Sequence, residues 1–287
     1  MNDPRCPVIS TRVAQMGERD HLFAGHEVFA ELLGKESLSS LLALSAGLPR
    51  LSRGDVTMLD DLATVLMLCD QRIWPVKLTR LVASYGNALH GFSAGNLMHA
   101  NLFIGAGPCQ RGAELLQELM NRLGGPGGLE DQRRLEAGIE AIVSRERWPG
   151  FGVPFRVTDE RMDALKAHLA ESERGQRPYW RLFLRVEEYL LRVRKTGTNI
   201  LGGVYTAMLD MRFTPPQAGW MLVMILQGNF SGAAFEGAQQ QASALQELPA
   251  SACKYEGPAA RVSPRARLSG GEATRAGQGA VRERTTK

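Results

Sequence analysis

The sequence predicts an all-α protein. Apolar residues recur three and four positions apart over most of the chain, alternating runs of the kind that form β-strands are almost absent, and glycine and proline separate the periodic segments. The chain has 287 residues, of which 44% are hydrophobic and 22% charged, so it is long enough to bury a sizeable core. We therefore expect about a dozen helices in one large or two medium-sized domains.

The N-terminal third opens on residues 7–25, whose short, turn-rich pattern predicts an irregular or strand-like entry. Apolar periodicity then predicts three short helices, and Asp55 or Thr57 is expected to cap the third of them. Pro75 suits the first turn of a fourth helix, which runs towards Gly86. The three short helices are expected over residues 28–33, 38–48 and 58–68.

The longest apolar segment covers residues 84–112 and predicts a buried helix that ends at a glycine-rich turn, residues 105–108. Small residues interrupt this segment, and each glycine costs about 1 kcal/mol against alanine in a helix interior. Close approach of neighbouring backbones is the usual compensation, so we expect tight packing against other helices. The small residues are Gly86, Ala88, Gly91, Ala94, Gly95 and Ala100.

The second half of the chain continues with amphipathic helices, and two more glycine-containing turns interrupt it at residues 150–154 and 197–203. A last helical region of about thirty residues begins near Phe213 and divides near Gly228. Because sites often form where helix ends converge, the three glycine turns mark the expected site. The intervening helices are expected over residues 113–123, 129–144, 161–169, 179–194 and 200–211.

Composition argues against several classes of protein. The four cysteines include no CxxC pair, so neither a zinc site nor a disulfide framework is indicated, and we expect reduced thiols. No apolar run has the length of a membrane span, and the opening MNDPRCPVISTR lacks the features of a secretory signal. The sequence therefore predicts a cytoplasmic protein with no membrane contact.

The net charge of +4 arises at the C-terminal end. Residues 261–287 hold seven basic and two acidic side chains among glycine, serine, threonine and alanine, so the rest of the chain is close to neutral. This composition predicts a disordered basic tail over residues 263–287. Contact of the tail with RNA, DNA or an acidic membrane is the alternative, but an inert solvated tail is favoured, and no nucleic-acid partner is predicted.

Several strings of the sequence resemble those of one known family and cover about residues 20–264. They are FAGHEVFAELLGKESLSSLLALSAGLP, CDQRIWP, LVASYGNALHGFSAG, PGFGVPFRVTDER, NILGGVYTAMLDM, FTPPQAG and KYEGPAARVSP. On these strings the chain resembles the citrate synthase family, in particular its short bacterial and citryl-CoA lyase-like members and the lyase portion of ATP-citrate lyase. The resemblance implies a multi-helical fold with a large domain (residues 1–105 and 199–262) and a small domain (residues 106–198).

The family makes or breaks a carbon–carbon bond next to a CoA thioester, and the resemblance implies three catalytic groups. A carboxylate removes a proton from the acyl methyl carbon, one histidine donates to the thioester oxygen, and a second histidine polarises the ketone. In this sequence the two histidine positions fall on Gly105 and Val153. The carboxylate position falls on Asn199, or on Thr198 if the register shifts by one. None of these residues is a histidine or a carboxylate, so the usual catalytic residues are substituted.

Several other residues are candidates for binding the substrate or for catalysis. Arg161 matches an arginine that holds a substrate carboxylate in the family, and Arg156 is a second candidate for a carboxylate or a CoA phosphate. Asn199 is a candidate to hydrogen-bond an enolate or carbonyl. His90 and His99 are candidate catalytic groups, but nine residues span about two and a half helical turns, so at most one faces a cleft. A role in the core or an interface is the alternative for both.

Two functions follow from the resemblance and the substitutions. The first is an acyltransferase or citryl-CoA lyase-like enzyme that uses acetyl-CoA or another acyl-CoA as co-substrate, with a keto acid such as oxaloacetate and no tightly bound cofactor. The second is a non-catalytic relative, a pseudoenzyme that binds an acyl-CoA or a partner subunit. The resemblance also implies a homodimer, and we expect the helix over residues 84–103 at its interface, where Gly95 would allow close approach.

Overall fold

The structure, a computed structural model of the chain, describes residues 10–67, 70–99, 104–153, 158–242, 250–252 and 254–258. The chain divides into two compact units, Met1–Ala242 and Ser243–Lys287. The first unit holds all the described α-helices, and the second holds the 3-10 helix η4 (Ala250–Ala252). The predicted basic tail lies outside the described residues, and the division of the first unit into a large and a small domain stays a prediction.

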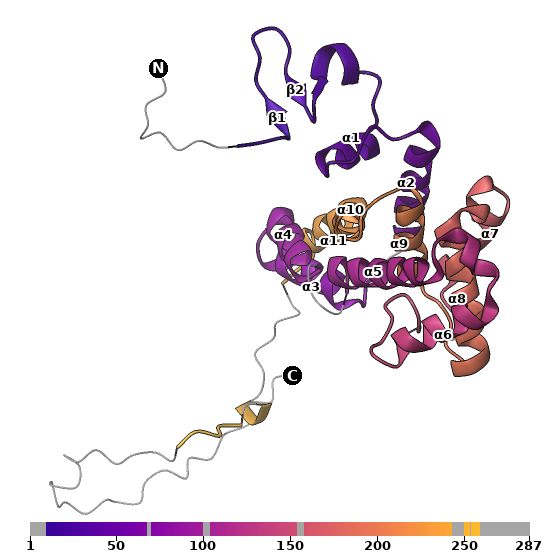
Figure 1. Cartoon of the computed structure of the whole chain (residues 1–287). Coiled ribbons are helices and arrows are strands. Elements are labelled where there is room, and N and C mark those ends of the chain that lie inside the picture. The colour runs from indigo at the N-terminus through magenta and orange to yellow at the C-terminus, as the bar shows by residue number, and fades with distance from the viewer. Residues whose placement is uncertain are drawn as a thin grey trace, which may run out of the picture. The chain divides into compact units, whose positions relative to one another are not determined.

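The all-α prediction is confirmed, with eleven α-helices and three two-residue strands among the described residues (Figure 1). The helices are α1 (Leu38–Ser45), α2 (Arg53–Leu66), α3 (Trp74–Tyr85), α4 (Ala88–His99), α5 (Ala106–Leu123), α6 (Gln132–Val143), α7 (Glu160–Ala170), α8 (Pro178–Arg194), α9 (Ile200–Asp210), α10 (Pro215–Ile225) and α11 (Gln227–Ala238). Two further 3-10 helices are η2 (Pro126–Glu130) and η3 (Glu173–Gln176).

The expected strand-like entry is a small antiparallel sheet in the order β1-β2-β3. Its strands are β1 (Ala14–Gln15), β2 (Leu22–Phe23) and β3 (His26–Glu27), and Leu22 pairs with both Gln15 and Glu27. The Asp20 carboxylate accepts hydrogen bonds from the backbone N–H groups of Phe29 and Ala30. These bonds lie in the first turn of the π-helix η1 (Val28–Leu32), which replaces the α-helix expected there.

Two predicted helix boundaries are wrong. The N-cap of α2 is Ser52, whose hydroxyl accepts from the backbone N–H of Asp55 at 3.1 Å, so neither Asp55 nor Thr57 caps this helix. The predicted end of the fourth helix at Gly86 is confirmed, but the next helix, α4, begins at Ala88 and not at residue 84, with Asn87 Oδ1 accepting from the N–H of His90.

The first glycine turn starts a helix rather than forming a loop. Gly105, with φ +90°, is the N-cap of α5, and Ala106, Gly107 and Pro108 are its first residues. Proline is tolerated there because the first N–H groups of a helix have no partner within it. The helix predicted from residue 113 therefore begins about two turns earlier.

Helix α5 lies at the centre of the core and contacts α6, α8, α9 and α10 (Figure 1). Its side chains Leu115, Leu116 and Leu119 are completely buried. A methyl group added to Gly112 would lie 2.3 Å from the ring of Tyr205 in α9, so only glycine allows this close approach. Helix α5 thus begins at the first glycine turn and packs against α9, which begins in the third.

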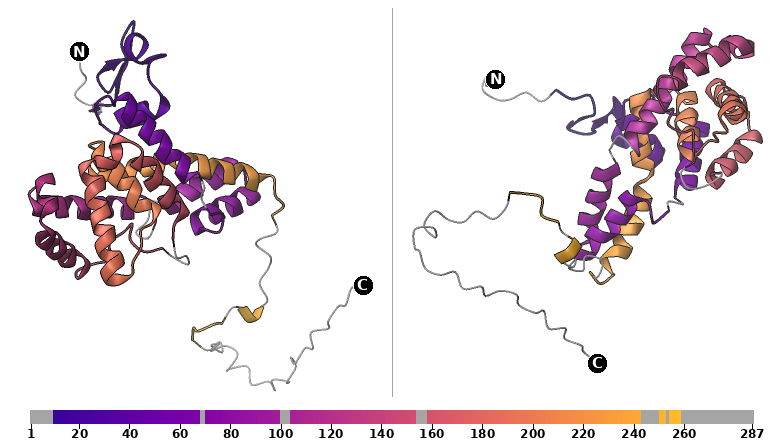
Figure 2. Two further views of the ribbon diagram at one scale, coloured as in Figure 1. Left: turned by 90° about the vertical axis from the view of Figure 1, so that its right-hand side faces the viewer. Right: turned by 90° about the horizontal axis from the view of Figure 1, so that it is seen from below.

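Helices α3, α4 and α11 pack side by side in a second group, which Figure 2 shows from two further directions. The small residues of α4 face this group: a methyl group on Gly95 would lie 1.9 Å from Thr79 Oγ1 and 2.8 Å from the Phe230 ring. The expected compensation by close packing is therefore confirmed. The expectation that Gly95 lies at a dimer interface is wrong, because its partners belong to the same chain.

Candidate functional site

The second and third glycine turns are bonded to each other. The backbone N–H of Gly152 donates to the carbonyl oxygen of Gly197 at 2.7 Å, and that of Asn199 donates to the carbonyl oxygen of Gly150 at 2.9 Å. Phe151 and Thr198 form an isolated antiparallel bridge between the two segments. These contacts bring together two of the three turns that the sequence singled out.

The contact between these turns and helix α9 leaves no room for side chains. A methyl group on Gly150, which has φ +94°, would lie 2.7 Å from both the Cα atom of Gly202 and the hydroxyl of Tyr205. The Tyr205 hydroxyl donates to the carbonyl oxygen of Pro149 at 2.9 Å. The second turn therefore lies directly on the first turn of α9.

Asn199 connects the turns and caps α9. Its Oδ1 accepts from the backbone N–H of Leu201 at 3.0 Å, and its Nδ2 donates to the carbonyl oxygen of Gly152 at 2.7 Å. Both ends of the carboxamide are thus engaged within the chain. This structural use accounts for asparagine at the position, because an aspartate would place a negative charge against the Gly152 carbonyl.

Arg161 lies beside the start of α9 in a close ion pair. Its Nε and Nη2 donate to the two carboxylate oxygens of Asp159, each at 2.9 Å, and Asp159 Oδ2 also accepts from the backbone N–H of Ile200 at 2.9 Å. Burial opposes ionisation of Asp159, but the bonds from Arg161 and Ile200 outweigh it and lower the pKa of this carboxyl. Arg161 stays partly exposed, so its charge lies next to the turns that Asn199 connects.

A second buried carboxylate, from helix α8, accepts a hydrogen bond from the third turn. Glu187 of α8 accepts from the hydroxyl of Thr198 at 2.5 Å and from the ammonium group of Lys166 at 2.6 Å. Glu187 and Thr198 are both buried. The sequence reasoning missed Glu187, although one signal was available: it follows Phe183 by four residues and precedes Leu190 by three, which places a charge on an apolar helix face.

His99 lies beside the first glycine turn. It is 6% exposed, and a methyl group added to Gly105 would lie 2.7 Å from its Nδ1 and Cε1 atoms. The ring packs edge to face against Phe230 with 5.4 Å between the centroids. Burial lowers the pKa of His99 to about 4, so its imidazole is neutral at neutral pH. The histidine ring therefore fills the space next to the position where the family resemblance placed a histidine.

The remaining predicted residues are spread out. His90 is exposed on α4, with its ring against Gly86, so the two histidines do point to different environments. Val153 is half-buried at the end of the second turn. Arg156 lies outside the described residues.

The first turn is set apart from the other two along α5. Trp148 Nε1 donates to the carbonyl oxygen of Gly112 at 3.4 Å, which places the second turn near the middle of that helix. Gly105 lies seven residues earlier, about 10 Å along the helix axis. The structure thus joins the second and third turns closely and places His99 with Gly105 at the N-terminal end of α5, about two helical turns away.

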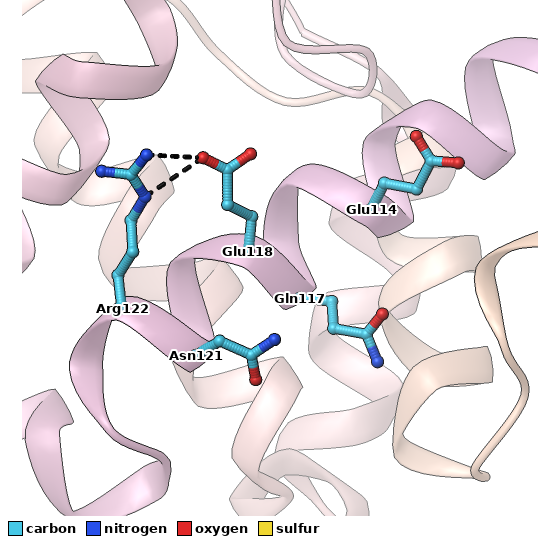
Figure 3. A pocket seen from close by; sticks show the side chains of 5 residues that line it. All are labelled: Glu114, Gln117, Glu118, Asn121 and Arg122. Atoms are coloured by element: carbon cyan, nitrogen blue, oxygen red, sulfur yellow. Dashed lines mark hydrogen bonds and ion pairs between the residues drawn. The ribbon is translucent and has the colours of Figure 1, made fainter.

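A surface hollow lies along α5, away from the residues that contact the glycine turns, and Figure 3 shows the side chains that line it. All five come from one helix, and Glu118 is already paired with Arg122 and Arg145. None of the predicted site residues lines it, so we do not assign it a ligand. The lining residues are Glu114, Gln117, Glu118, Asn121 and Arg122.

The described residues contain neither a cluster of metal-ligating side chains nor a membrane-spanning helix. No group of three or more histidine, cysteine, aspartate or glutamate side chains is placed to hold a metal ion there. No helix of that part of the chain combines the length and the apolar character needed to cross a membrane. Of the four cysteines, Cys109 is described and is a buried free thiol.

Comparison with solved structures identifies the fold. The chain matches citryl-CoA lyase from Hydrogenobacter thermophilus with a TM-score of 0.72 and 16% identity, over 91% of this chain and 100% of that one. It matches ATP citrate lyase from Methanothrix soehngenii, solved with citrate and coenzyme A, with a TM-score of 0.67 and 14% identity, over 88% of this chain and 42% of that one.

A third match is citrate synthase from Thermoplasma acidophilum, solved with carboxymethyl coenzyme A and oxaloacetate, with a TM-score of 0.57 and 12% identity, over 79% of this chain and 58% of that one. The chain thus spans all of the lyase but less than two thirds of the two larger proteins. No protein-family profile matches the sequence, and no curated protein matches it. The likeness of structure confirms the predicted fold: the chain has the citrate synthase-like fold.

Proposed function

We propose that the chain acts on a CoA thioester and a small keto acid in the manner of citrate synthases and citryl-CoA lyases, making or breaking a carbon–carbon bond. The observation that carries this proposal is the convergence of the second and third turns beside Arg161, in a fold whose solved relatives hold coenzyme A together with citrate or oxaloacetate. An acyl-CoA such as acetyl-CoA is the co-substrate, and no tightly bound cofactor is required.

In this proposal Arg161 holds a carboxylate of the keto acid, and Arg156 assists it. A guanidinium group binds a carboxylate through two parallel hydrogen bonds. Asp159 already accepts two such bonds from Arg161, so the incoming carboxylate shares the guanidinium with it. Asn199 then acts by positioning the turns, since its carboxamide is engaged, and His99 is the histidine closest to the turn that lacks one.

A non-catalytic relative is the second candidate, and a specific observation favours it. The positions of the family's histidines and carboxylate are Gly105, Val153 and Asn199, and Gly105 has no space for a side chain. Each acid or base group normally contributes about 10²–10⁴ in rate, so a protein without replacements would bind an acyl-CoA and leave it unchanged.

A homodimer is also proposed, with the outer face of α4 as its interface. This helix contains no charged residue, and its outward side chains Leu89 and Leu97 are 68% and 73% exposed. Exposed leucines on an uncharged helix favour contact with another protein surface.

Two measurements separate the candidates. Calorimetric titration with acetyl-CoA and free CoA tests binding, and release of free CoA from acetyl-CoA and oxaloacetate, with oxaloacetate formation from citryl-CoA as the reverse assay, tests turnover. The enzyme proposal predicts turnover that Arg161→Gln abolishes and that Arg181→Gln, which alters an exposed pair with Glu130, leaves intact. Binding without turnover supports the non-catalytic relative, and absence of both contradicts both functions.

A further inference from the structure

A largely buried ion pair links helix α7 to helix α8 beside the third turn. The ammonium group of Lys166 in α7 donates to Glu187 Oε1 in α8 at 2.6 Å, and the two side chains are 27% and 10% exposed. Lys166 also lies 3.8 Å from the more exposed carboxylate of Asp163. A buried ion pair adds little net stability, because the cost of removing two charges from water offsets their attraction. Its effect here is geometric, since it fixes the distance between the two helices.

The same carboxylate oxygen bonds the residue at the middle of the contact between the second and third turns. Glu187 Oε1 accepts from the hydroxyl of Thr198 at 2.5 Å, and Thr198 is 6% exposed. The backbone of Thr198 forms the antiparallel bridge with Phe151, between the two backbone hydrogen bonds that join the turns. The side chain of Thr198 is therefore bonded to α8 while its backbone pairs with the second turn.

A different carboxylate bonds the residue on the other side of Asn199. Asp159 Oδ2 accepts from the backbone N–H of Ile200 at 2.9 Å, and Asp159 is paired with Arg161 of α7. Two carboxylates, each paired with a cation of α7, thus bond the residues directly before and after Asn199. The Glu187 pair contains no proposed ligand contact, so it can keep the turn in place while Arg161 shares its guanidinium with a ligand.

We propose that Glu187 is a positioning residue for the candidate site: paired with Lys166, it holds Thr198 and with it the third turn. The turn then keeps its place beside α7, where Arg161 lies. Glu187 touches no reacting group and acts only through Thr198. The attachment of the turn stands on these contacts alone, whereas its effect on turnover rests on the proposed function.

Two substitutions of Thr198 separate its hydroxyl from its shape. Thr198→Val keeps the size of the side chain and removes the donor to Glu187, whereas Thr198→Ser keeps the donor. Hydrogen exchange of the backbone amides of Gly152 and Asn199, which join the turns, measures how firmly the turns are held together. We expect exchange at both amides to become about tenfold faster in Thr198→Val, because a bond to a charged group is lost, and to stay within about threefold of wild type in Thr198→Ser.

A change of the cation tests the ion pair itself. Lys166→Met keeps a long side chain and leaves Glu187 without its cation, so the same two amides should exchange about tenfold faster. The matched control is His168→Gln, which removes the exposed bond from α7 to Asp61 and should leave both amides at the wild-type rate. Amides of α3 and α4 report whether each variant is folded. Unchanged exchange in Thr198→Val, or equal exchange in Lys166→Met and His168→Gln, overturns the proposal.

Turnover separates positioning from a merely structural contribution. Release of free CoA from acetyl-CoA and oxaloacetate is measured well below the unfolding midpoint of every variant, where a loss of stability alone leaves kcat and KM unchanged. A displaced turn should lower kcat at least about tenfold in Thr198→Val, with Thr198→Ser and His168→Gln near wild type. Faster exchange with unchanged kcat and KM overturns the role of Glu187 in the site. If the wild-type protein shows no turnover, the proposed function fails, and hydrogen exchange alone decides whether Glu187 holds the turn.

Discussion

The side-chain amide of Asn199 donates to the carbonyl oxygen of Gly152 at 2.7 Å while its carbonyl oxygen caps helix α9 through the N–H of Leu201. One side chain therefore fixes the second turn, the third turn and the start of a buried helix. The position at which the family resemblance implied a catalytic carboxylate has become a structural connection.

Asn199→Asp should destabilise the protein even though aspartate is a good N-cap. The variant keeps the acceptor for Leu201 but replaces the donor to Gly152 by a negatively charged oxygen, so we expect a loss of about 1–3 kcal/mol in the free energy of unfolding, measured by urea denaturation. The control is Asn87→Asp, where the side chain caps α4 by accepting from the N–H of His90. It should change stability by less than about 0.5 kcal/mol, and equal effects of the two changes would contradict this role of Asn199.

Restoring a side chain at the first turn should damage the fold. Gly105→Ala brings a methyl group to 2.1 Å from a backbone oxygen, in addition to the strain of a positive φ, and Gly105→His adds a ring in the space of His99. Gly125→Ala is the control, because Gly125 has φ +96° and no atom within 4 Å of an added methyl. The control should cost about 1–3 kcal/mol from backbone strain alone, and the change at Gly105 clearly more. Thermal denaturation compares them, and similar midpoints would argue against the clash.

Glycine in α4 serves packing inside the chain. Gly95→Ala should therefore lower stability by at least about 1–3 kcal/mol, since the methyl group would overlap Thr79 Oγ1. Gly232→Ala in α11 is the matched change in another helix, where an added methyl has open space around it, and it should stabilise by about 1 kcal/mol. Changes of the same sign in denaturation experiments would contradict the assignment of Gly95 to an internal contact.

The proposed homodimer can be tested on the outer face of α4. Replacing both Leu89 and Leu97 by lysine should shift the mass in light scattering from dimer to monomer, because four added charges per dimer interface oppose association. Leu38→Lys changes a leucine of similar exposure in α1 and should leave the mass unchanged. A wild-type protein that is already monomeric, or a double variant that stays dimeric, would exclude this interface.

Acid should weaken the fold through His99. Its pKa is about 4 in the folded chain and 6.5 as a free side chain, so the unfolded state takes up the proton first and stability falls as the pH drops from 6.5 to 4. The full loss is about 3 kcal/mol. Burial raises the pKa of Asp210 to about 6. Its effect on stability has the opposite sign, because the folded state binds a proton more readily than the unfolded state as the pH falls.

Comparison of wild-type protein with His99→Phe removes the contribution of Asp210, which both proteins share. Urea denaturation at pH 7.5, 6 and 5 should show wild type losing stability relative to the variant at each step downwards. A constant difference across this range would show that His99 is not buried in its neutral form.

Much of the fold was predictable because amphipathic helices place apolar residues three and four positions apart in the sequence. The apolar spacing predicted the positions of α6 and α8, and the strings around Gly150 and Asn199 predicted the fold and two of the converging turns. The end of α3 at Gly86 agrees with the predicted helix that runs towards this glycine, but the start of α4 was placed four residues too early, because the apolar pattern runs on across the break. The start of α5 was missed because glycine and proline mark turns and first helical turns alike.

The site was less predictable because its contacts join residues by their positions in space. The sequence shows Gly105 and His99 six residues apart but gives no sign that the ring of one lies against the backbone of the other. Glu187 supports Thr198 through a bond from one helix to a turn, which no local pattern encodes. Gly95 reads equally well as an interface residue or an internal one until its neighbours, Thr79 and Phe230, are known.

The contact between Gly150 and Gly202 limits how the molecule can open and close. Because the turn and the first turn of α9 meet without intervening side chains, and Tyr205 bonds the turn from the same helix, the two segments have no freedom to slide past each other. A hinge at the predicted domain boundary, between residues 198 and 199, would have to pull them apart. Any closure over a ligand must therefore carry the start of α9 with the second turn as one rigid piece and bend the chain further from the site.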